Sequence, residues 1–216
     1  MTFLGRAHNA LLRLGFHLLY NEFAWSYDLV GWVVSLGQWR AWGRASLPYL
    51  LGPRVLEVAF GTGDILVDLQ AAGFTVYGLD LSPHMTAITH RKLQKAGVTV
   101  PISCGAVQSL PFTDGVFDSV VVTFPPSFIR EEIVLQELAR VLRLGGRLVV
   151  VDRAWLQRPI FVARLIEWLY AITGQRPQRY TSQTDWLREI GWDATEHEQQ
   201  LAKSAVYLWV AERPEP

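Results

Sequence analysis

The 216-residue chain has little cysteine, no net charge and no long apolar run. Its single cysteine, Cys104, excludes an internal disulfide and a metal cluster built on several cysteines, and it favours a reducing, cytoplasmic location. Twenty basic residues balance twenty acidic ones, so no electrostatic footprint indicates a nucleic-acid partner. The five histidines show no ligand spacing with cysteine or acidic residues, and we expect no metal.

A membrane span needs roughly 18 uninterrupted apolar residues, which this sequence lacks, so we expect no integral membrane segment. Leucines over residues 8–20 recur at helical spacing. They leave a peripheral membrane contact open, although no basic face supports one. We interpret this segment as mature protein, because no small-residue cleavage site follows it.

Half of the residues are hydrophobic and nine are tryptophan, enough for one large core. The length favours a single domain over 1–216. Cys104 falls in an apolar strand pattern, and we expect its thiol to be buried and inert.

The middle of the chain alternates strand and helix patterns, which predicts an α/β fold with a parallel sheet and helices on both faces. The expected elements are strands at 54–59, 75–79, 99–103, 117–122 and 147–152, and helices at 64–72, 83–95 and 130–142. Helical patterns at 8–20, 25–36 and 39–50 precede them, and helices at 155–173 and 182–190 and strands at 192–200 and 204–211 follow.

The most informative stretch is Arg54–Asp64, where an apolar run ends in Glu57 and a Gly-x-Gly turn before a helical pattern begins. A second apolar run then ends in Asp80, which is typical of a nucleotide-binding βαβ unit. Leu66 stands where a dinucleotide fingerprint needs its third glycine. The carboxylate of Glu57 suits a ligand with a cationic end better than a diphosphate.

Four motifs in order resemble those of class I S-adenosylmethionine-dependent methyltransferases, in the branch of the ubiquinone/menaquinone C-methyltransferases. They are Val55–Asp64, Gly78–Met85, the Leu-Pro-Phe segment Ser109–Asp118, and Leu138–Leu148 before the fifth strand. The resemblance implies a Rossmann-like, doubly wound, mostly parallel seven-stranded sheet with one antiparallel closing strand. It divides the domain into an N-terminal helical cap (1–52), a cofactor-binding core (53–152), a helical lid (153–191) and closing strands (192–216).

The same resemblance implies S-adenosyl-L-methionine as the cofactor. It places Glu57 and Thr123 near the methionine moiety, with Gly61, Thr62 and Gly63 as the turn beneath it. Phe60 either packs on the cofactor or belongs to the core.

The adenosine half of the cofactor would lie against the second strand. Asp80 would accept hydrogen bonds from the ribose hydroxyls, and Leu81 would pack on the adenine face. Ala106 and Val107 occupy the adenine edge, where the family has an acidic or amide side chain. Their backbone groups or Gln108 would have to replace that side chain.

The acceptor would be a small hydrophobic or aromatic molecule, such as a quinone, phenol or lipid. Tryptophan-rich segments at both ends of the core suggest a lid over it, and ordinary core packing explains them equally well. No catalytic base is assigned, although carbon and phenolic acceptors need one. The candidates near the acceptor are His17, Tyr27, Asp28 and His84.

Two other functions stay open. One is a methyltransferase-fold protein with weak or no activity that acts through a partner, an interpretation that Ala106 and Val107 favour. The other is a nicotinamide-dependent oxidoreductase, which the missing third glycine disfavours. A homodimer is also compatible with the sequence.

Overall fold

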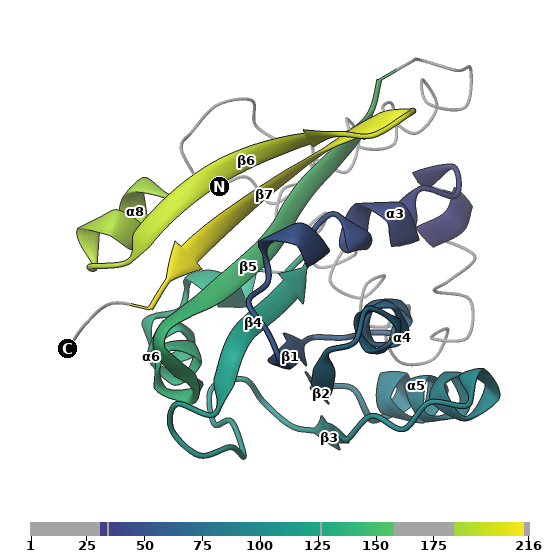
Figure 1. Ribbon diagram of the computed structural model, residues 1–216, viewed down its shortest axis with the longest axis horizontal. Coiled ribbons are helices and arrows are strands. Elements are labelled where there is room, and N and C mark those ends of the chain that lie inside the picture. Colours follow the sequence, from purple (N-terminus) through teal and green to yellow (C-terminus); the bar gives the residue numbers. More distant parts are fainter. Residues whose placement is uncertain (1–30, 34, 126, 158–183, 214–216) are drawn as a thin grey trace, which may run out of the picture.

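The computed structural model of the chain describes residues 31–33, 35–125, 127–157 and 184–213. Seven strands form one sheet in the order β3-β2-β1-β4-β5-β7-β6 (Figure 1). Five neighbouring strands are parallel, and β7 runs antiparallel between β5 and β6. The doubly wound, seven-stranded fold predicted from the sequence, with its one antiparallel strand, is confirmed.

The elements follow the predicted alternation. The strands are β1 (Arg54–Val58), β2 (Thr75–Asp80), β3 (Ile102–Cys104), β4 (Phe117–Thr123), β5 (Leu142–Leu156), β6 (Asp193–Gln200) and β7 (Ser204–Glu212). The helices are α3 (Trp39–Arg44), α4 (Asp64–Ala71), α5 (Pro83–Ala96), α6 (Glu132–Val141) and α8 (Asp185–Glu189), with short 3₁₀ turns η2 (Leu47–Tyr49) and η3 (Ser127–Arg130).

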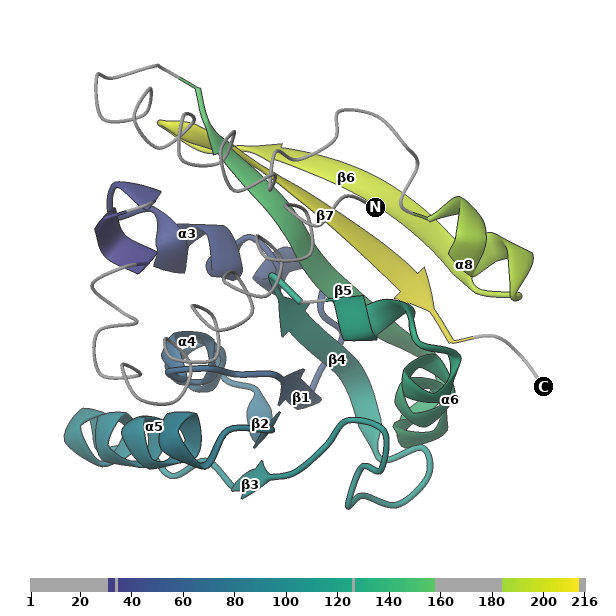
Figure 2. The same cartoon turned by 180° about the vertical axis from the view of Figure 1, so that it is seen from behind.

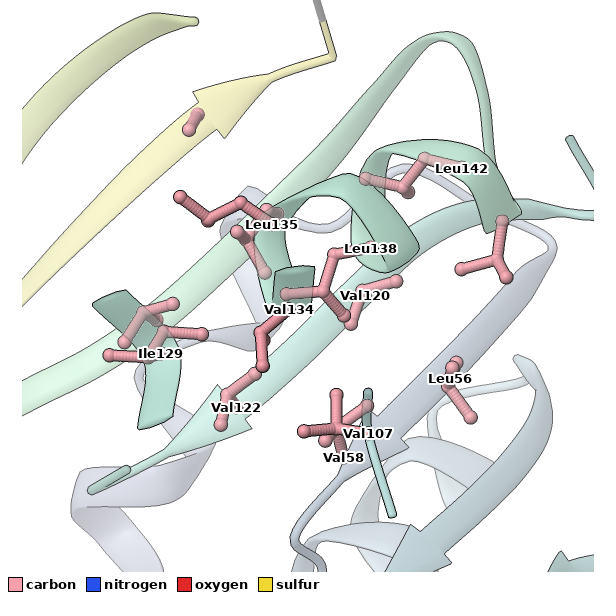
Figure 3. Close-up of a cluster of buried hydrophobic side chains, with 14 of the residues drawn as sticks. Leu56, Val58, Val107, Val120, Val122, Ile129, Val134, Leu135, Leu138 and Leu142 are labelled. Carbon is pink, nitrogen blue, oxygen red and sulfur yellow. The ribbon is translucent and has the colours of Figure 1, made fainter. Parts of the chain in front are cut away.

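Helices cover both faces of the sheet. In Figure 2, α3, α4 and α5 lie on one side of it, and α6 and α8 lie on the other. Figure 3 shows the second side, where Val134 and Leu138 of α6 pack toward Val120 and Val122 of β4. Strands buried on both faces need apolar residues at successive positions, which explains the continuous run Val120–Val122.

One predicted helix, 155–173, is wrong at its start. Strand β5 continues to Leu156, because its backbone pairs with β7 as far as Leu156 and Ser204. The same strand also begins earlier than predicted, at Leu142, with a register irregularity opposite Phe117 and Ser119. Residues 158–173 lie outside the described part of the chain, as does the predicted helix at 8–20.

Other boundaries move for local reasons. The helical pattern at 39–50 splits into α3 and η2, with Pro48 in the first turn of η2. Strand β3 begins only at Ile102, directly after Pro101. Leu36 and Gly37 both have positive φ, at 50° and 77°, and separate the helical residues 31–33 from α3.

Candidate functional site

A pocket of about 380 Å³ lies at the carboxyl ends of β1, β2 and β4. The order of the sheet reverses here, since β1 is flanked by β2 on one side and by β4 on the other. Ligands of doubly wound sheets bind at such a switch point. The described residues that line the pocket are Trp39, Arg40, Gly43, Glu57, Val58, Ala59, Phe60, Gly61, Thr62, Asp64, Ile65, Leu79, Asp80, Leu81, Ser82, Pro83, Gly105, Ala106, Val107, Gln108, Thr123, Phe124 and Phe128.

Nine of the ten predicted cofactor residues come together in this lining, and Gly63 does not. Gly63 instead has φ 76° and stands at the N-terminus of α4. A Cβ at Gly63 would lie 2.4 Å from the Cγ2 of Thr89, so this glycine lets the turn pack against α5. Its role is to shape the turn behind the pocket.

Asp80 connects the glycine turn to the second strand. One carboxylate oxygen accepts the N–H of Gly61 and the other accepts the N–H of Ser82, both at 2.8 Å. Burial raises the pKa of Asp80, and the two N–H groups oppose that shift. The alternative role of Asp80 as a helix cap is not observed, because the hydroxyl of Ser82 accepts the N–H of Met85 and caps α5.

Glu57 is a buried carboxyl group in the pocket wall, with 1% of its surface exposed. Its Oε2 atom is buried without a hydrogen-bond partner. Burial raises its pKa well above the usual range, and the nearby carboxylates of Asp64, Asp80 and Asp68 raise the pKa further, while the backbone N–H of Leu66 donates to the carboxylate and opposes the shift. A negative charge here is only partly compensated by this N–H group, so a ligand that brings a positive charge would stabilise the ionised form.

The rim of the pocket carries the residues predicted for the adenosine half. Leu81 is 72% exposed, an unusual position for a large apolar side chain and one that suits contact with a flat ligand. Ala106 is exposed, and Val107 is buried in the main core. Gln108 also lines the pocket, but its amide donates to the carboxylate of Glu131 at 2.9 Å.

Phe60 belongs to the core, one of the two roles considered for it from the sequence, and its packing on the cofactor stays a prediction. It lines the pocket, and it also belongs to the core cluster between β1 and α4. A Cβ on Gly78 would lie 2.8 Å from the Phe60 ring, so the ring packs directly on β2.

The opposite end of the pocket is apolar and aromatic. Trp39 of α3 and Phe124, which follows β4, have ring centroids 4.6 Å apart, and Phe128 lies in the same lining. Trp39 belongs to the tryptophan-rich N-terminal segment from which a lid over the acceptor was expected. Its contact with Phe124 was not predicted, because the two residues are far apart in the sequence. The position of Phe124 directly after Thr123, at a strand's carboxyl end, was the available signal.

Of the candidate bases, only His84 falls in the described part of the chain. It is absent from the pocket lining and lies in the first turn of α5. The expectation of a buried Cys104 was wrong: β3 is an edge strand, and Cys104 at its end is exposed. Among the described residues, no group of three histidine, cysteine or acidic side chains could hold a metal ion, and no helix is long and apolar enough to cross a membrane.

Comparison with known proteins identifies relatives. The profile of the ubiE/COQ5 methyltransferase family matches residues 13–184. A demethylmenaquinone methyltransferase from Thermus thermophilus is 39% identical over 140 residues, covering 62% of this chain and 64% of the relative. A demethylmenaquinone methyltransferase from Mycolicibacterium vanbaalenii is 37% identical over 155 residues, which cover 70% of this chain and 65% of the relative. The chain thus spans less than two thirds of the length of these curated relatives.

Solved structures agree on the fold. A candidate S-adenosyl-L-methionine-dependent methyltransferase from Methanococcus maripaludis superimposes with a TM-score of 0.65 at 16% identity, covering 91% of this chain and 95% of the other. Geranyl diphosphate methyltransferase in complex with SAM superimposes with a TM-score of 0.57 at 17% identity, covering 81% of this chain and 85% of the other. Likeness at this identity establishes the fold alone, while the profile match extends over most of the chain. The chain belongs to the ubiE/COQ5 methyltransferase family.

Proposed function

We propose that this chain is an S-adenosyl-L-methionine-dependent methyltransferase whose acceptor is a small aromatic molecule of the reduced-quinone type. The observation that carries the proposal is Glu57, a buried carboxyl group with an unpartnered oxygen in the pocket wall. The cofactor carries an ammonium and a sulfonium group, and either positive charge would compensate this carboxylate. When bound, the cofactor supplies an electrophilic methyl group.

The other described residues fit the same ligand. Asp80 is held by two backbone N–H groups, and its oxygens retain lone pairs for ribose hydroxyls. Leu81 offers an exposed apolar surface to the adenine ring, and Thr123 would lie beside the methionine moiety. In a site of this kind, positioning and exclusion of water contribute most of the rate, since displacement at a sulfonium needs little acid–base help.

The choice of acceptor rests on the names of the relatives, which are demethylmenaquinone methyltransferases. The aromatic end of the pocket supports an apolar, flat acceptor. A cytoplasmic location, a homodimer and a peripheral membrane contact stay predictions, as does the four-part division of the domain.

The competing function is a protein of this fold without activity. It is favoured by Ala106, which cannot accept from the adenine amino group through its side chain. A nicotinamide-dependent oxidoreductase is disfavoured further, because the carboxyl group of Glu57 would face a diphosphate.

The test is calorimetric titration of the full chain with S-adenosylmethionine, S-adenosylhomocysteine and NADH. We expect micromolar binding of the two sulfur ligands only. Asp80→Ala should weaken it at least about ten-fold, the effect of one or two lost hydrogen bonds to a charged group.

The matched control is Asp114→Ala, which removes an exposed carboxylate outside the pocket lining and should bind normally. No binding by the wild-type chain would reject the proposal and favour the inactive alternative. Binding of NADH alone would favour the oxidoreductase.

A further inference from the structure

The aromatic end of the pocket is built around one stacked pair. The ring centroids of Trp39 and Phe124 are 4.6 Å apart and the ring planes are tilted by 31°, a separation within the range of favourable aromatic pairs. Both side chains are half-buried, and both line the pocket. The pair therefore presents aromatic surface to whatever occupies this end.

The backbone of Phe124 is strained. Its φ is 50°, in the left-handed region that a bulky residue rarely adopts. The N–H of Phe124 donates to the carbonyl of Val151 at 2.7 Å, which fixes the residue at the junction of β4 and β5. Strain of this kind is retained where it sets the direction of a functional side chain.

A second layer holds the pair in place. The buried ring of Trp42 lies 6.2 Å from Trp39 and 6.1 Å from Phe124, and its indole N–H donates to the hydroxyl of Ser204 at 2.9 Å. Residues from α3, the β4 end and β7 thus support one another. A platform supported on two sides loses little entropy when a ligand stacks on it.

The platform adjoins the charged part of the pocket. Thr123, the residue before Phe124, is also in the pocket lining, and Glu57 pairs in register with Val121 of the same strand. If Glu57 holds the positively charged end of the cofactor, an acceptor bound at the aromatic end would lie close to it in the same pocket.

We propose that Trp39 and Phe124 form the platform on which the flat ring of the methyl acceptor stacks, and that this platform selects fused aromatic acceptors over linear apolar ones. This inference rests on the proposed function and adds two specificity-determining residues to it. Phe124 would position the acceptor ring, and Trp39, whose ring packs on that of Phe124, would add aromatic surface and hold Phe124 in place.

The test measures acceptor binding without turnover. The full chain is first saturated with S-adenosylhomocysteine and then titrated anaerobically with 1,4-dihydroxynaphthalene, with geraniol as a linear ligand of equal carbon number. We expect the diol to bind and geraniol to bind at least about ten-fold more weakly, the scale of an aromatic stack. Phe124→Leu and Trp39→Leu should each weaken binding of the diol about ten-fold while leaving the affinity for S-adenosylhomocysteine unchanged.

Three variants separate a lost ring from a damaged fold. Phe124→Gly removes the ring but relieves the positive φ, so it should lose diol binding with a smaller loss of stability than Phe124→Ala. Phe124→Tyr keeps the ring and should retain binding. Trp155→Leu, which removes a 39% exposed aromatic residue outside the pocket lining, should bind the diol normally.

The outcomes are distinct. Failure to bind S-adenosylhomocysteine would reject the proposed function itself. Normal binding of S-adenosylhomocysteine with equal diol affinity in the wild type and Phe124→Leu would overturn the platform alone. The same holds if geraniol binds as tightly as the diol.

Discussion

At the scale of single residues, the pocket places Glu57 in an environment that opposes its charge. The group is buried, one oxygen lacks a partner, and three carboxylates surround it. An arrangement unfavourable to the free protein is expected where a ligand supplies the missing interaction. A substitution that removes the charge of Glu57 should therefore raise the stability of the free protein and lower its affinity for the cofactor.

Glu57→Gln should stabilise the ligand-free protein and weaken cofactor binding. The pKa of Glu57 is raised above its ordinary value of 4.5 in the folded chain, so the folded state holds a proton that the unfolded state releases. This contribution is present below pH 4.5 and is lost as the pH rises through the window up to the folded pKa. The advantage of the glutamine variant in the free energy of unfolding should therefore grow with pH, to about 1–2 kcal/mol.

Urea denaturation of both proteins at pH 5 and pH 8 checks this dependence, and calorimetry with S-adenosylmethionine checks the binding loss. The pKa of Asp80 is also raised, chiefly by its own burial, and that contribution is common to both proteins. A variant that is less stable than the wild type at pH 8 would contradict the account of Glu57.

At the scale of elements, the position of α3 over the pocket depends on a missing side chain. A Cβ at Gly43 would lie 2.4 Å from the Cδ1 of Ile65 and 3.8 Å from Thr123. The absence of that atom lets the helix approach α4 and the end of β4. Trp39, one turn earlier on α3, is thereby brought against Phe124.

Gly43→Ala should move α3 outward and destabilise the protein. Ile65 can turn its terminal methyl aside, so we expect a modest loss of about 1 kcal/mol, at the low end for an overpacked core. Ile65→Val removes Cδ1 but keeps Cγ1, which would lie 2.8 Å from the new Cβ, so the double variant should recover part of the lost stability. Chemical denaturation of the two single variants and the double variant gives the coupling, and purely additive effects would argue against this contact.

The sequence predicted those elements whose cause is local. Periodicity and the capping pair Ser82-Pro83 located α5, and the glycine turn located α4. The continuation of β5 to Leu156 could not be predicted in this way, because pairing with β7 decides it and the local pattern is equally helical.

The same distinction applies to the site. Glu57 and Asp80 follow strand patterns that can be recognised in the sequence, and they lie in the pocket. The positive φ of Ala59 and of Phe124, at 57° and 50°, has no sequence signal, since neither residue is glycine. The contact between Trp39 and Phe124 arises only when α3 folds back over β4.

At the scale of the whole molecule, two of the three core clusters draw on elements from both the N-terminal half and the C-terminal end of the described chain. The main cluster joins Leu56 of β1 to Ala211 of β7 through α6, and the third joins Trp42 of α3 to Val206. The pocket lies where these layers meet, with lining residues from α3, β1, β2 and the end of β4. Because every layer contributes to the core that supports the pocket, unfolding of one layer should destroy binding.

Because the layers depend on one another, we expect a single cooperative thermal unfolding transition, and we expect bound cofactor to raise the melting temperature of the whole protein. Far-ultraviolet circular dichroism and tryptophan fluorescence should give the same melting temperature, as expected for a single domain over residues 1–216. S-adenosylhomocysteine at a hundred times its Kd should add about 2.7 kcal/mol, which raises the melting temperature of a chain of this length by roughly 5–10 °C. Asp80→Ala should melt as one unit but respond far less to the ligand. Two transitions, of which the ligand moves only one, would instead mean that the closing strands fold independently of the cofactor-binding core.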